Sequence, residues 1–402
     1  MNAVPRLRPP SLATPADDTL VVQRIEETAT FEALRPEWNE LLQASASNCV
    51  FLTWEWLFAW WRNLSEGRRL SLITVRRGGR LIALAPLAVR PRSLDRLLPW
   101  PSLEFLGTGL AGSDYLDVIV RRGHEREGLA AVADAIAAAG AVLELSHVPA
   151  NVSAAAQLAG DLARRLGWTA SASRINVCPF IKLSGHSWPS YLASLGSAHR
   201  YNVQRRLKNL TKQFDVRFER ASSEEQRRET LEVLIDLHNR RWRERGGSQS
   251  FATAALRAFY ADVSRFGLER GWLRLFVLRL DGRPAAALHG YQYGGTFSFY
   301  QAGFDPGFAK QSVGLVTMAL TIKSAIEEGA TEYDLLHGDE PYKYQWAGKT
   351  RDLERIELFS PGVRGQLSRR ALGLSRTARR MARRVFGNSL ANWLVVAKAL
   401  SE

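Results

Sequence analysis

A degenerate internal repeat is the feature that most constrains how this chain can fold. The segment 72–83 has the pattern of a strand, a tight turn with glycine and a second strand, and 275–286 has the same pattern. Gly79 in the first turn matches Gly282 in the second. A supersecondary unit that recurs at long range predicts two similar folding units.

The elements around the two hairpins recur in the same order. Thr53 and Thr253 are plausible N-caps of the helix that precedes each hairpin. The predicted helices are 31–43, 51–62 and 125–139 in the first half and 229–244, 251–266 and 313–328 in the second. The strands predicted after the hairpins are 103–106, 115–120 and 142–145, then 296–302 and 332–336.

This order favours a duplicated α/β fold, with two tandem domains of mixed twisted sheets flanked by helices and a basic helix at the C-terminus. We expect a disordered N-terminus at 1–20, a first domain at 21–177, a second domain at 178–360 and a basic tail at 361–402.

The composition is that of a globular protein in a reducing compartment. The 402 residues suffice for two cores, and 46% apolar residues with 12 tryptophans argue against a disordered chain. Cys49 and Cys178 are far apart and match no metal-ligand spacing, so we expect neither a disulfide framework nor a metal site. Residues 1–19 lack an apolar signal segment and no run of about 18 apolar residues occurs. A cytoplasmic location is therefore expected.

The segment 333–346 combines two acids, a lysine and several aromatic residues at a predicted strand exit. Burial beside aromatic rings can shift the pKa values of such groups towards catalytic use. We predict that Asp339 or Glu340 acts as a base and that Lys343 stabilises negative charge. The alternative is a structural ion pair of these carboxylates with Lys343 or Arg351.

A phosphate-binding loop is predicted in 303–315, where glycine and serine lead into a helix. Free backbone N–H groups and the helix dipole attract anions at such a helix start. Residues 311–316, Gln-Ser-Val-Gly-Leu-Val, resemble the Gln/Arg-x-x-Gly-x-Gly/Ala loop that binds the acyl-CoA pyrophosphate in GNAT acyltransferases. Val316 departs from that pattern, which has a small residue there. The expected cofactor-binding residues are Lys310, Gln311, Ser312, Val313, Gly314 and Leu315.

Three segments, 51–56, 300–306 and 338–346, carry a wider resemblance that runs from about residue 22 to 360. They resemble the CelD-type, cellulose-biosynthesis-associated acetyltransferases, a tandem-GNAT family related to the Fem-type aminoacyl transferases. The resemblance implies two GNAT-like domains around a shared cleft, with acetyl-CoA or another acyl-CoA as co-substrate and no metal. The corresponding stretch of the first half, 121–128, lacks the loop pattern, so the donor site is expected in the second half only.

Further residues are expected along the cleft. His289 lies on a predicted strand and is a candidate catalytic residue, with a satisfied structural histidine as the alternative. The basic helix 199–212 is expected to face the cleft and meet an anionic acceptor, or else to be a solvated helix face. The predicted substrate-binding residues are Tyr300, Gln301, Arg200, Arg205, Tyr342 and Trp346.

The tail 361–402 carries nine Arg and Lys residues against one Glu. Arginines and apolar residues alternate at helical spacing, and Trp393 follows them, which predicts a basic amphipathic helix on an anionic membrane surface. Peripheral attachment to the inner face of the membrane is one option for this protein. Nucleic acid is a competing partner, and packing on the body of the protein is the third option.

These patterns predict an acyltransferase that moves an acyl group from acyl-CoA to an amine or hydroxyl of a glycan or envelope-polysaccharide precursor. An aminoacyl-tRNA-dependent Fem-type transferase and a catalytically inactive, membrane-associated binding scaffold remain alternatives. The sequence has no serine nucleophile elbow, Walker loop or dinucleotide-binding glycine motif, so other catalytic classes find no support.

Overall fold

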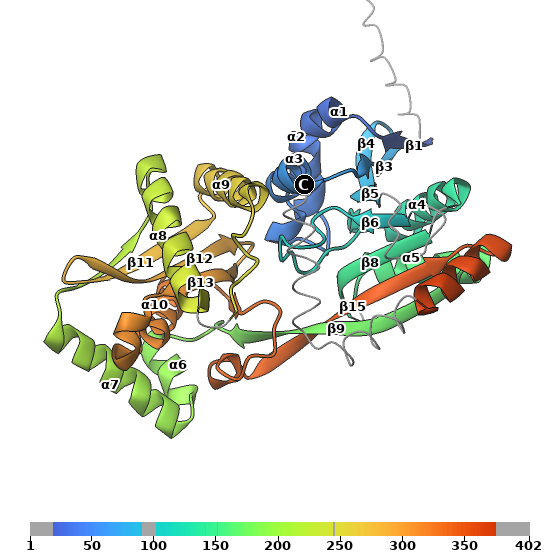
Figure 1. Cartoon of the computed structure of the whole chain (residues 1–402). Helices are drawn as coiled ribbons and strands as arrows, with labels where there is room; N and C mark the ends of the chain where they lie inside the picture. Colours follow the sequence, from blue (N-terminus) through green and yellow to red (C-terminus); the bar gives the residue numbers. More distant parts are fainter. Residues whose placement is uncertain (1–18, 91–101, 141, 151, 244–245, 375–402) are drawn as a thin grey trace, which may run out of the picture.

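The computed structural model describes residues 19–90, 102–140, 142–150, 152–243 and 246–374 (Figure 1). Its helices are α1 Thr28–Ala33, α2 Arg35–Gln43, α3 Trp54–Leu64, α4 Glu125–Ala139, α5 Ala154–Leu166, α6 Trp188–Ser194, α7 Ser197–Gln213, α8 Glu224–Arg243, α9 Ala254–Glu269 and α10 Val313–Glu327. Its strands are β1 Leu20–Ile25, β2 Arg69–Leu70, β3 Leu72–Arg77, β4 Arg80–Ala85, β5 Leu87–Arg90, β6 Ser102–Phe105, β7 Ile119–Val120, β8 Val142–Pro149, β9 Thr169–Lys182, β10 Val216–Arg220, β11 Leu273–Leu280, β12 Arg283–Tyr293, β13 Thr296–Phe304, β14 Glu332–Asp334 and β15 Lys349–Phe359.

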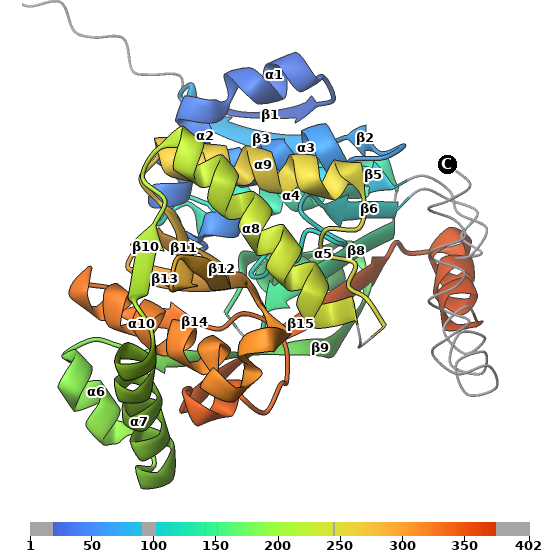
Figure 2. The ribbon, with the colours of Figure 1, turned by 60° about the vertical axis from the view of Figure 1, so that its left-hand side comes forward.

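The described strands form two sheets, which confirms the predicted mixed α/β fold class. A four-stranded sheet has the order β1-β3-β4-β7, and an eleven-stranded sheet has the order β10-β11-β12-β13-β14-β9-β15-β8-β6-β5-β2. In the second half α8 and α9 pack on one side of the sheet, while α10 packs on β12 and β13 together with α7 and α6 (Figure 2).

The repeated hairpins are present as β3–β4 and β11–β12. Both turn at the predicted glycines, with φ +78° at Gly79 and +77° at Gly282, a region that glycine enters without steric cost. Thr53 and Thr253 cap α3 and α9 as expected, because their side chains accept bonds from the backbone N–H groups of Trp56 and Leu256.

One long strand from each half joins the two halves into a continuous sheet. β9 pairs with β14 at one end and with β15 along most of its length, and β15 also pairs with β8 of the first half. Figure 1 shows both strands crossing the base of the molecule. The predicted domain boundary at residue 177 falls inside β9, and the last strand of the predicted second domain, β15, is built into the sheet of the first.

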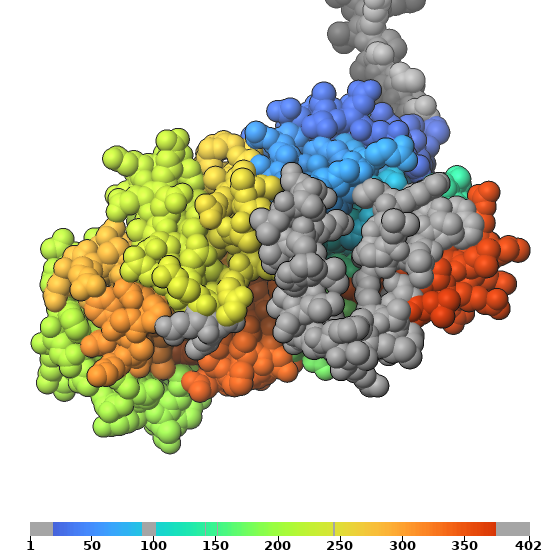
Figure 3. Space-filling view, viewed as in Figure 1, coloured from blue at the N-terminus to red at the C-terminus, as the bar shows by residue number. Residues whose placement is uncertain are grey.

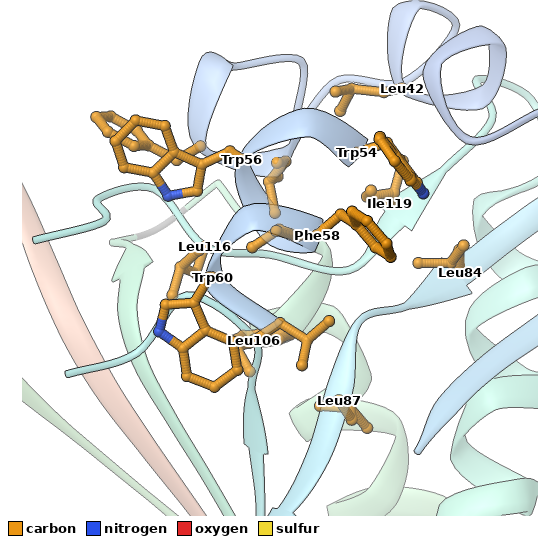
Figure 4. Close-up of a cluster of buried hydrophobic side chains, with 14 of the residues drawn as sticks. Leu42, Trp54, Trp56, Phe58, Trp60, Leu84, Leu87, Leu106, Leu116 and Ile119 are labelled. Carbon is orange, nitrogen blue, oxygen red and sulfur yellow. The ribbon is translucent and has the colours of Figure 1, made fainter. Parts of the chain in front are cut away.

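Helix α3 supplies the core between the halves. Trp54 stacks on Phe58 (ring centroids 4.3 Å apart) on one side of the helix, and Trp56 and Trp60 lie on the other side (Figure 4). Trp56 contacts the rings of Phe259, Tyr291 and Tyr300 in the second half. Residues 54–60 of α3 are buried on all sides, because α3 packs against α9 as well as against its own half.

The strand predicted at 115–120 is present only as β7. Tyr115 has φ +57°, and its chain leaves the sheet so that the polar residues of 113–117 reach other parts of the molecule. Hydrogen bonds to distant side chains have replaced strand pairing here, which alternation in the sequence alone does not reveal.

The first part of the basic tail forms a helix over 363–374. Its buried face places Leu372 against Val142 and Phe359 of the first half. In Figure 3 this segment forms the red right-hand edge, beside the first half. Residues 375–402, with Trp393 and most of the tail arginines, lie outside the described residues, as do residues 1–18 of the predicted disordered N-terminus. No helix in the described ranges has the length and hydropathy of a membrane span.

Candidate active site

Two parallel strands separate at the centre of the second half. β13 and β14 pair only from Thr296↔Glu332 to Ser298↔Asp334. Beyond this pair the chain after β14 bonds to β9 through the Leu335 amide and the Pro179 carbonyl (3.0 Å). β13 instead continues along β12. A cavity of about 340 Å³, here called the α10 cavity, opens between the diverging chains.

The N-terminus of α10 forms one wall of this cavity. Ser312 has φ +55° and makes no side-chain cap, and the first helical bond joins the Val316 amide to the Ser312 carbonyl (3.1 Å). The three amides before Val316 have no backbone acceptor in the described residues, as expected at a helix start. Ser312, Val313, Gly314 and Leu315 all line the cavity, so four of the six predicted cofactor-binding residues gather there.

The other two predicted residues lie just outside. Lys310 does not line the cavity, but its carbonyl accepts a bond from the Arg206 guanidinium (2.6 Å). The Gln311 Oε1 atom is buried without a hydrogen-bond partner in the described part of the chain. Arg241, which the sequence reasoning did not select, lines the cavity with its guanidinium 4.8 Å from the ring centroid of Phe304.

The segment after β14 forms the opposite wall through Tyr342, Gln345 and Trp346. Lys343 points away from the cavity and is only 3% exposed. Its Nζ donates to the carbonyls of Leu336 (3.2 Å) and His337 (2.7 Å) and forms an ion pair with Glu340 (3.0 Å). Lys343 therefore holds this turn together.

Two neighbouring groups complete the turn. The Asp339 carboxylate accepts a hydrogen bond from the Tyr344 hydroxyl. Gly338 has φ +128°, and a Cβ on it would lie 2.8 Å from the Lys343 Nζ, so the turn requires glycine. The predicted cluster of Asp339, Glu340 and Lys343 is thus assembled, with each charged group already paired.

His289 lies on the side of the sheet opposite the α10 cavity. It is fully buried, within 4.9–6.2 Å (ring centroids) of Tyr260, Tyr291 and Tyr300, and does not line the cavity. Neither ring nitrogen has a partner among the described residues. Burial lowers the pKa of His289 to about 3, so the ring is neutral at physiological pH.

The predicted substrate-binding residues divide between three places. Tyr342 and Trp346 line the α10 cavity. The Tyr300 hydroxyl donates to the Ala111 carbonyl (2.5 Å), and the Gln301 amide donates to the Ser250 hydroxyl (3.2 Å). Both side chains are therefore held on the side of the sheet that α8 and α9 cover. Arg200 and Arg205 lie on α7, where they bond to the Ala193 carbonyl and the Asn202 side chain.

Asp114 and His337 form a pair between the halves that was not predicted from the sequence. Asp114 of the first half is fully buried and accepts bonds from the backbone amide (2.9 Å) and the ring Nδ1 (2.8 Å) of His337. His337 was inside the segment 333–346, but nothing in the sequence pairs it with a residue 223 positions earlier. A short Ser-Asp-Tyr run in a loop carries no recognisable signal.

A larger cavity of about 880 Å³, here called the central cavity, is lined by both halves. Ser298 and Asp334, the last pair of the β13–β14 ladder, line it, whereas Phe299 lines the α10 cavity. Because adjacent strand residues point to opposite faces, the two cavities lie on opposite sides of β13.

Two buried carboxylates lie in the wall of the central cavity. Burial raises the pKa of Asp334 to about 7, against hydrogen bonds from the Tyr115 hydroxyl (2.6 Å) and the Leu336 amide. Burial also raises the pKa of Asp117 to about 6, although it accepts bonds from the amides of Ala154 and Ala155 at the start of α5. The described residues contain no group of three or more His, Cys, Asp and Glu side chains that could hold a metal.

Comparison with known proteins gives a class for the half of the chain that holds the separating strands and the uncapped start of α10. Residues 197–344 match the family model described as Acetyltransferase (GNAT) domain. This segment of the second half thus corresponds to a GNAT domain, which supports an acyltransferase. A search of curated protein sequences found no match.

Solved structures show the same fold over most of the chain. FemX is similar at a TM-score of 0.59 and 14% identity, over 80% of this chain and 95% of FemX. The C-terminal domain of a putative lysylphosphatidylglycerol synthetase from Agrobacterium fabrum has a TM-score of 0.51 at 9% identity, over 83% of this chain and 92% of that domain. L-PGS from Bacillus licheniformis has a TM-score of 0.51 at 11% identity, over 86% and 96%. At these sequence identities the similarity shows a shared fold and nothing about the reaction.

Proposed function

We propose that the protein transfers an acyl group from acyl-CoA to an amine or hydroxyl of a glycan or envelope-polysaccharide precursor. The observation that carries the proposal is the α10 cavity, which has the uncapped N-terminus of α10 in its wall. The glycan acceptor rests on the resemblance of 51–56, 300–306 and 338–346 to CelD-type acetyltransferases.

The α10 cavity fits the chemistry of an acyl-CoA donor. The free amides at Val313, Gly314 and Leu315 and the positive end of the helix dipole suit a pyrophosphate. Arg206 and Arg241 add positive charge beside them. The remaining walls are mainly apolar, which suits the chain between the pyrophosphate and the thioester; they include Leu288, Phe299, Phe304 and Met318.

The acceptor is proposed to approach from the opposite side of β13. Ser298 and Asp334 face the central cavity there, with Asn48 and Tyr293 in the same wall. Hydroxyl, amide and carboxylate groups can hold the hydroxyls or amines of an acceptor, which apolar walls cannot. Transfer would then occur where β13 and β14 part.

Calorimetry with CoA tests the donor site. Gly314→Val should weaken CoA binding by at least tenfold, because a branched side chain would stand beside the amides that meet the phosphate. The fold tolerates a Cβ here, since it would lie 3.4 Å from the Phe304 ring. Gly348→Val is the matched control, because a Cβ at Gly348 meets nothing within 4 Å. Unchanged affinity in a folded Gly314→Val protein would place the donor elsewhere.

Transfer from aminoacyl-tRNA is the second candidate, favoured by the arginines of α7, of which Arg205 is exposed and Arg200 is half-buried. Arg200 and Arg205 lie on the helix that also carries Arg206, next to the α10 loop, and a basic surface suits nucleic acid. Incubation with a panel of acyl-CoA thioesters and with charged tRNA separates the two, by release of CoA or of free tRNA. Release of tRNA alone would favour the Fem-type reaction.

We also propose that the tail attaches the protein to an anionic membrane surface. On helix 363–374 the apolar side chains of Val363, Leu367 and Leu374 share one exposed face, and Arg369 and Arg370 are exposed beside it. Apolar groups with flanking arginines are what an interfacial helix requires.

A further inference from the structure

We propose that His337 is the residue that takes the proton from the acceptor and that Asp114 orients it. The inference rests on the acyl transfer proposed above and assigns the base in that reaction. It follows from the place of the pair in the fold, the geometry of its hydrogen bonds and the pairing of the competing groups.

Asp114 fixes both the backbone and the ring of His337. One carboxylate oxygen accepts from the His337 amide (2.9 Å) and the other accepts from ring Nδ1 (2.8 Å). A histidine that donates from Nδ1 to a carboxylate carries its free electron pair on Nε2. The side chain of His337 is 37% exposed although Asp114 is fully buried, so Nε2 is at the open end of the pair.

His337 stands beside the point at which the two parallel strands part. It lies three residues after Asp334, the last residue of the β13–β14 ladder. Lys343 bonds to the carbonyls of Leu336 and His337. Tyr342, Gln345 and Trp346 of the same segment line the α10 cavity. The turn that forms the cavity wall therefore also sets the position of His337.

The imidazole lies close to Gly112 of the first half and to the Tyr300 ring. A Cβ placed on Gly112 would lie 3.7 Å from His337 Cε1 and 3.8 Å from a ring atom of Tyr300. His337 and Tyr300 thus approach the same point of the first half. Tyr300 follows Phe299, which lines the α10 cavity on the other face. His337 lines neither the α10 cavity nor the central cavity, so the acceptor must extend beyond the central cavity to reach Nε2.

The charged groups around the ring favour a proton acceptor of moderate strength. Burial by itself lowers the pKa of His337, but the hydrogen bond and charge of Asp114, with a contribution from Glu340, outweigh burial and raise the pKa above 6.5. Lys343 acts in the opposite direction. The other neighbours are His147, with ring centroids 5.9 Å apart, Arg355 beside His147, and Cys178, whose Sγ lies 3.8 Å from Asp114.

The other candidate bases are committed to partners or buried. Asp339 accepts from Tyr344, and Glu340 pairs with Lys343. His289 is enclosed by tyrosines on the α8 and α9 side. Among the residues predicted from sequence, none combines an open nitrogen or oxygen with a buried orienting partner as His337 does.

The step balances without a further reactant. The acceptor nitrogen or oxygen forms a bond to the thioester carbon, and its proton moves to His337 Nε2. The carbon–sulfur bond then breaks, and CoA leaves as a thiolate. The imidazolium returns the proton to the thiolate or to water, so the products are the acylated acceptor and CoA thiol. Asp114 orients the ring and stabilises the imidazolium.

The pH dependence of CoA release tests the assignment, with water and a small primary amine as acceptors and acetyl-CoA as donor. His337→Ala should lower kcat/KM by roughly 100- to 10,000-fold, the usual range for a general base, and leave the CoA Kd within about threefold. Added imidazole should restore part of the activity. Asp114→Asn should move the acidic limb of the profile to lower pH, because the carboxylate that raises the histidine pKa is gone.

His147→Asn is the matched control, since it removes the neighbouring ring and asparagine tolerates the φ of +60° at this position. It should leave the profile unchanged. His337→Gln, which retains a polar side chain beside Asp114, replaces the alanine variant if that variant unfolds. A wild-type profile in folded His337 variants overturns the inference alone. Absence of CoA binding and of CoA release in the wild-type protein overturns the proposed acyl-CoA reaction, and the assignment of His337 with it.

Discussion

The Tyr115 hydroxyl of the first half donates a hydrogen bond of 2.6 Å to the Asp334 carboxylate of the second half. Asp334 is 1% exposed and ends the short ladder between β13 and β14. Arg351 lies 3.5 Å away but is itself paired with Glu332. The two halves thus meet at a buried acid that is expensive to ionise.

The stability of the Asp334→Asn variant relative to the wild-type protein should increase as the pH rises. Burial raises the pKa of Asp334 to about 7, above the unfolded value of 3.8. The folded state therefore binds the extra proton between these values, and wild-type stability falls as pH increases through that window. The asparagine variant does not lose stability in this way. In the wild-type protein the loss of unfolding free energy is about 1.4 kcal/mol for each unit by which the folded pKa exceeds the unfolded pKa. Urea unfolding at pH 4.5, 6 and 8 measures the difference.

Asp352→Asn is the control for that series. Asp352 also lines the central cavity, but its side chain is 41% exposed and paired with Arg174. Its effect on stability should be small. If the stability of Asp334→Asn relative to wild type does not change between pH 4.5 and pH 8, Asp334 is ionised in the folded protein at pH 6 and the cavity wall is wetter than the structure indicates.

His289→Leu should protect the protein against acid. Burial lowers the pKa of His289 to about 3, below its ordinary value of 6.5, so the unfolded state takes up the proton first. Wild-type stability is therefore lost as pH falls below 6.5, and the leucine variant should gain relative to wild type from pH 7 to pH 4.5. Thermal unfolding at both pH values measures this. CoA release should persist, and its loss in a folded variant would restore His289 as a catalytic candidate.

Lys343→Ala should reduce both stability and turnover. The variant leaves the carbonyls of Leu336 and His337 and the Glu340 carboxylate without Lys343. A buried polar group that loses its partner costs about 1–3 kcal/mol of unfolding free energy. Because the turn positions His337, turnover should fall by roughly 10- to 1000-fold. Denaturant unfolding and CoA release measure the two effects. Asp339→Asn should keep turnover within about threefold, since Asp339 contacts Tyr344 at the surface. A larger fall would make Asp339 the base.

Removal of the tail in two steps should separate packing from membrane attachment. A chain that ends at Leu374 keeps the contact of Leu372 with Val142 and Phe359 and should unfold at the wild-type temperature. A chain that ends at Ser360 loses the burial of Leu372, worth about 1.5–3 kcal/mol. Leu367→Glu in the full chain should weaken sedimentation with anionic vesicles, since Leu367 is 47% exposed. Salt-dependent binding to RNA without vesicle binding would favour nucleic acid instead.

The local elements could be predicted because their signals are local. Thr53 and Thr253 stand at N-cap positions, Gly79 and Gly282 stand in tight turns, and the loop before α10 carries a recognisable pattern. The chemistry of 333–346 was also visible as a gathering of charges. The contacts of these charged groups could not be predicted, because a turn of ten residues can direct Lys343 either to a ligand or to backbone carbonyls of the same turn.

The relationships between halves could not be predicted from one sequence. Asp114 and His337 are separated by 223 positions, and their pairing depends on how β7 and the residues before it leave the sheet. The sharing of β9 and β15 has no periodic signature either, because one strand can pair with any edge that its twist and polarity allow. Both features determine where the residues of the candidate site lie relative to one another.

The pairing of β15 with β8 has a consequence for how the protein is made. β8 and β9 have emerged from the ribosome long before residues 349–359 are synthesised, so the strand that belongs between them does not yet exist. Until then β8 lacks its neighbour on one edge and β9 lacks both of its neighbours, and unpaired strand edges are sites of aggregation. Neither half should therefore fold independently when it is excised at the repeat boundary, although the two hairpins recur in the sequence.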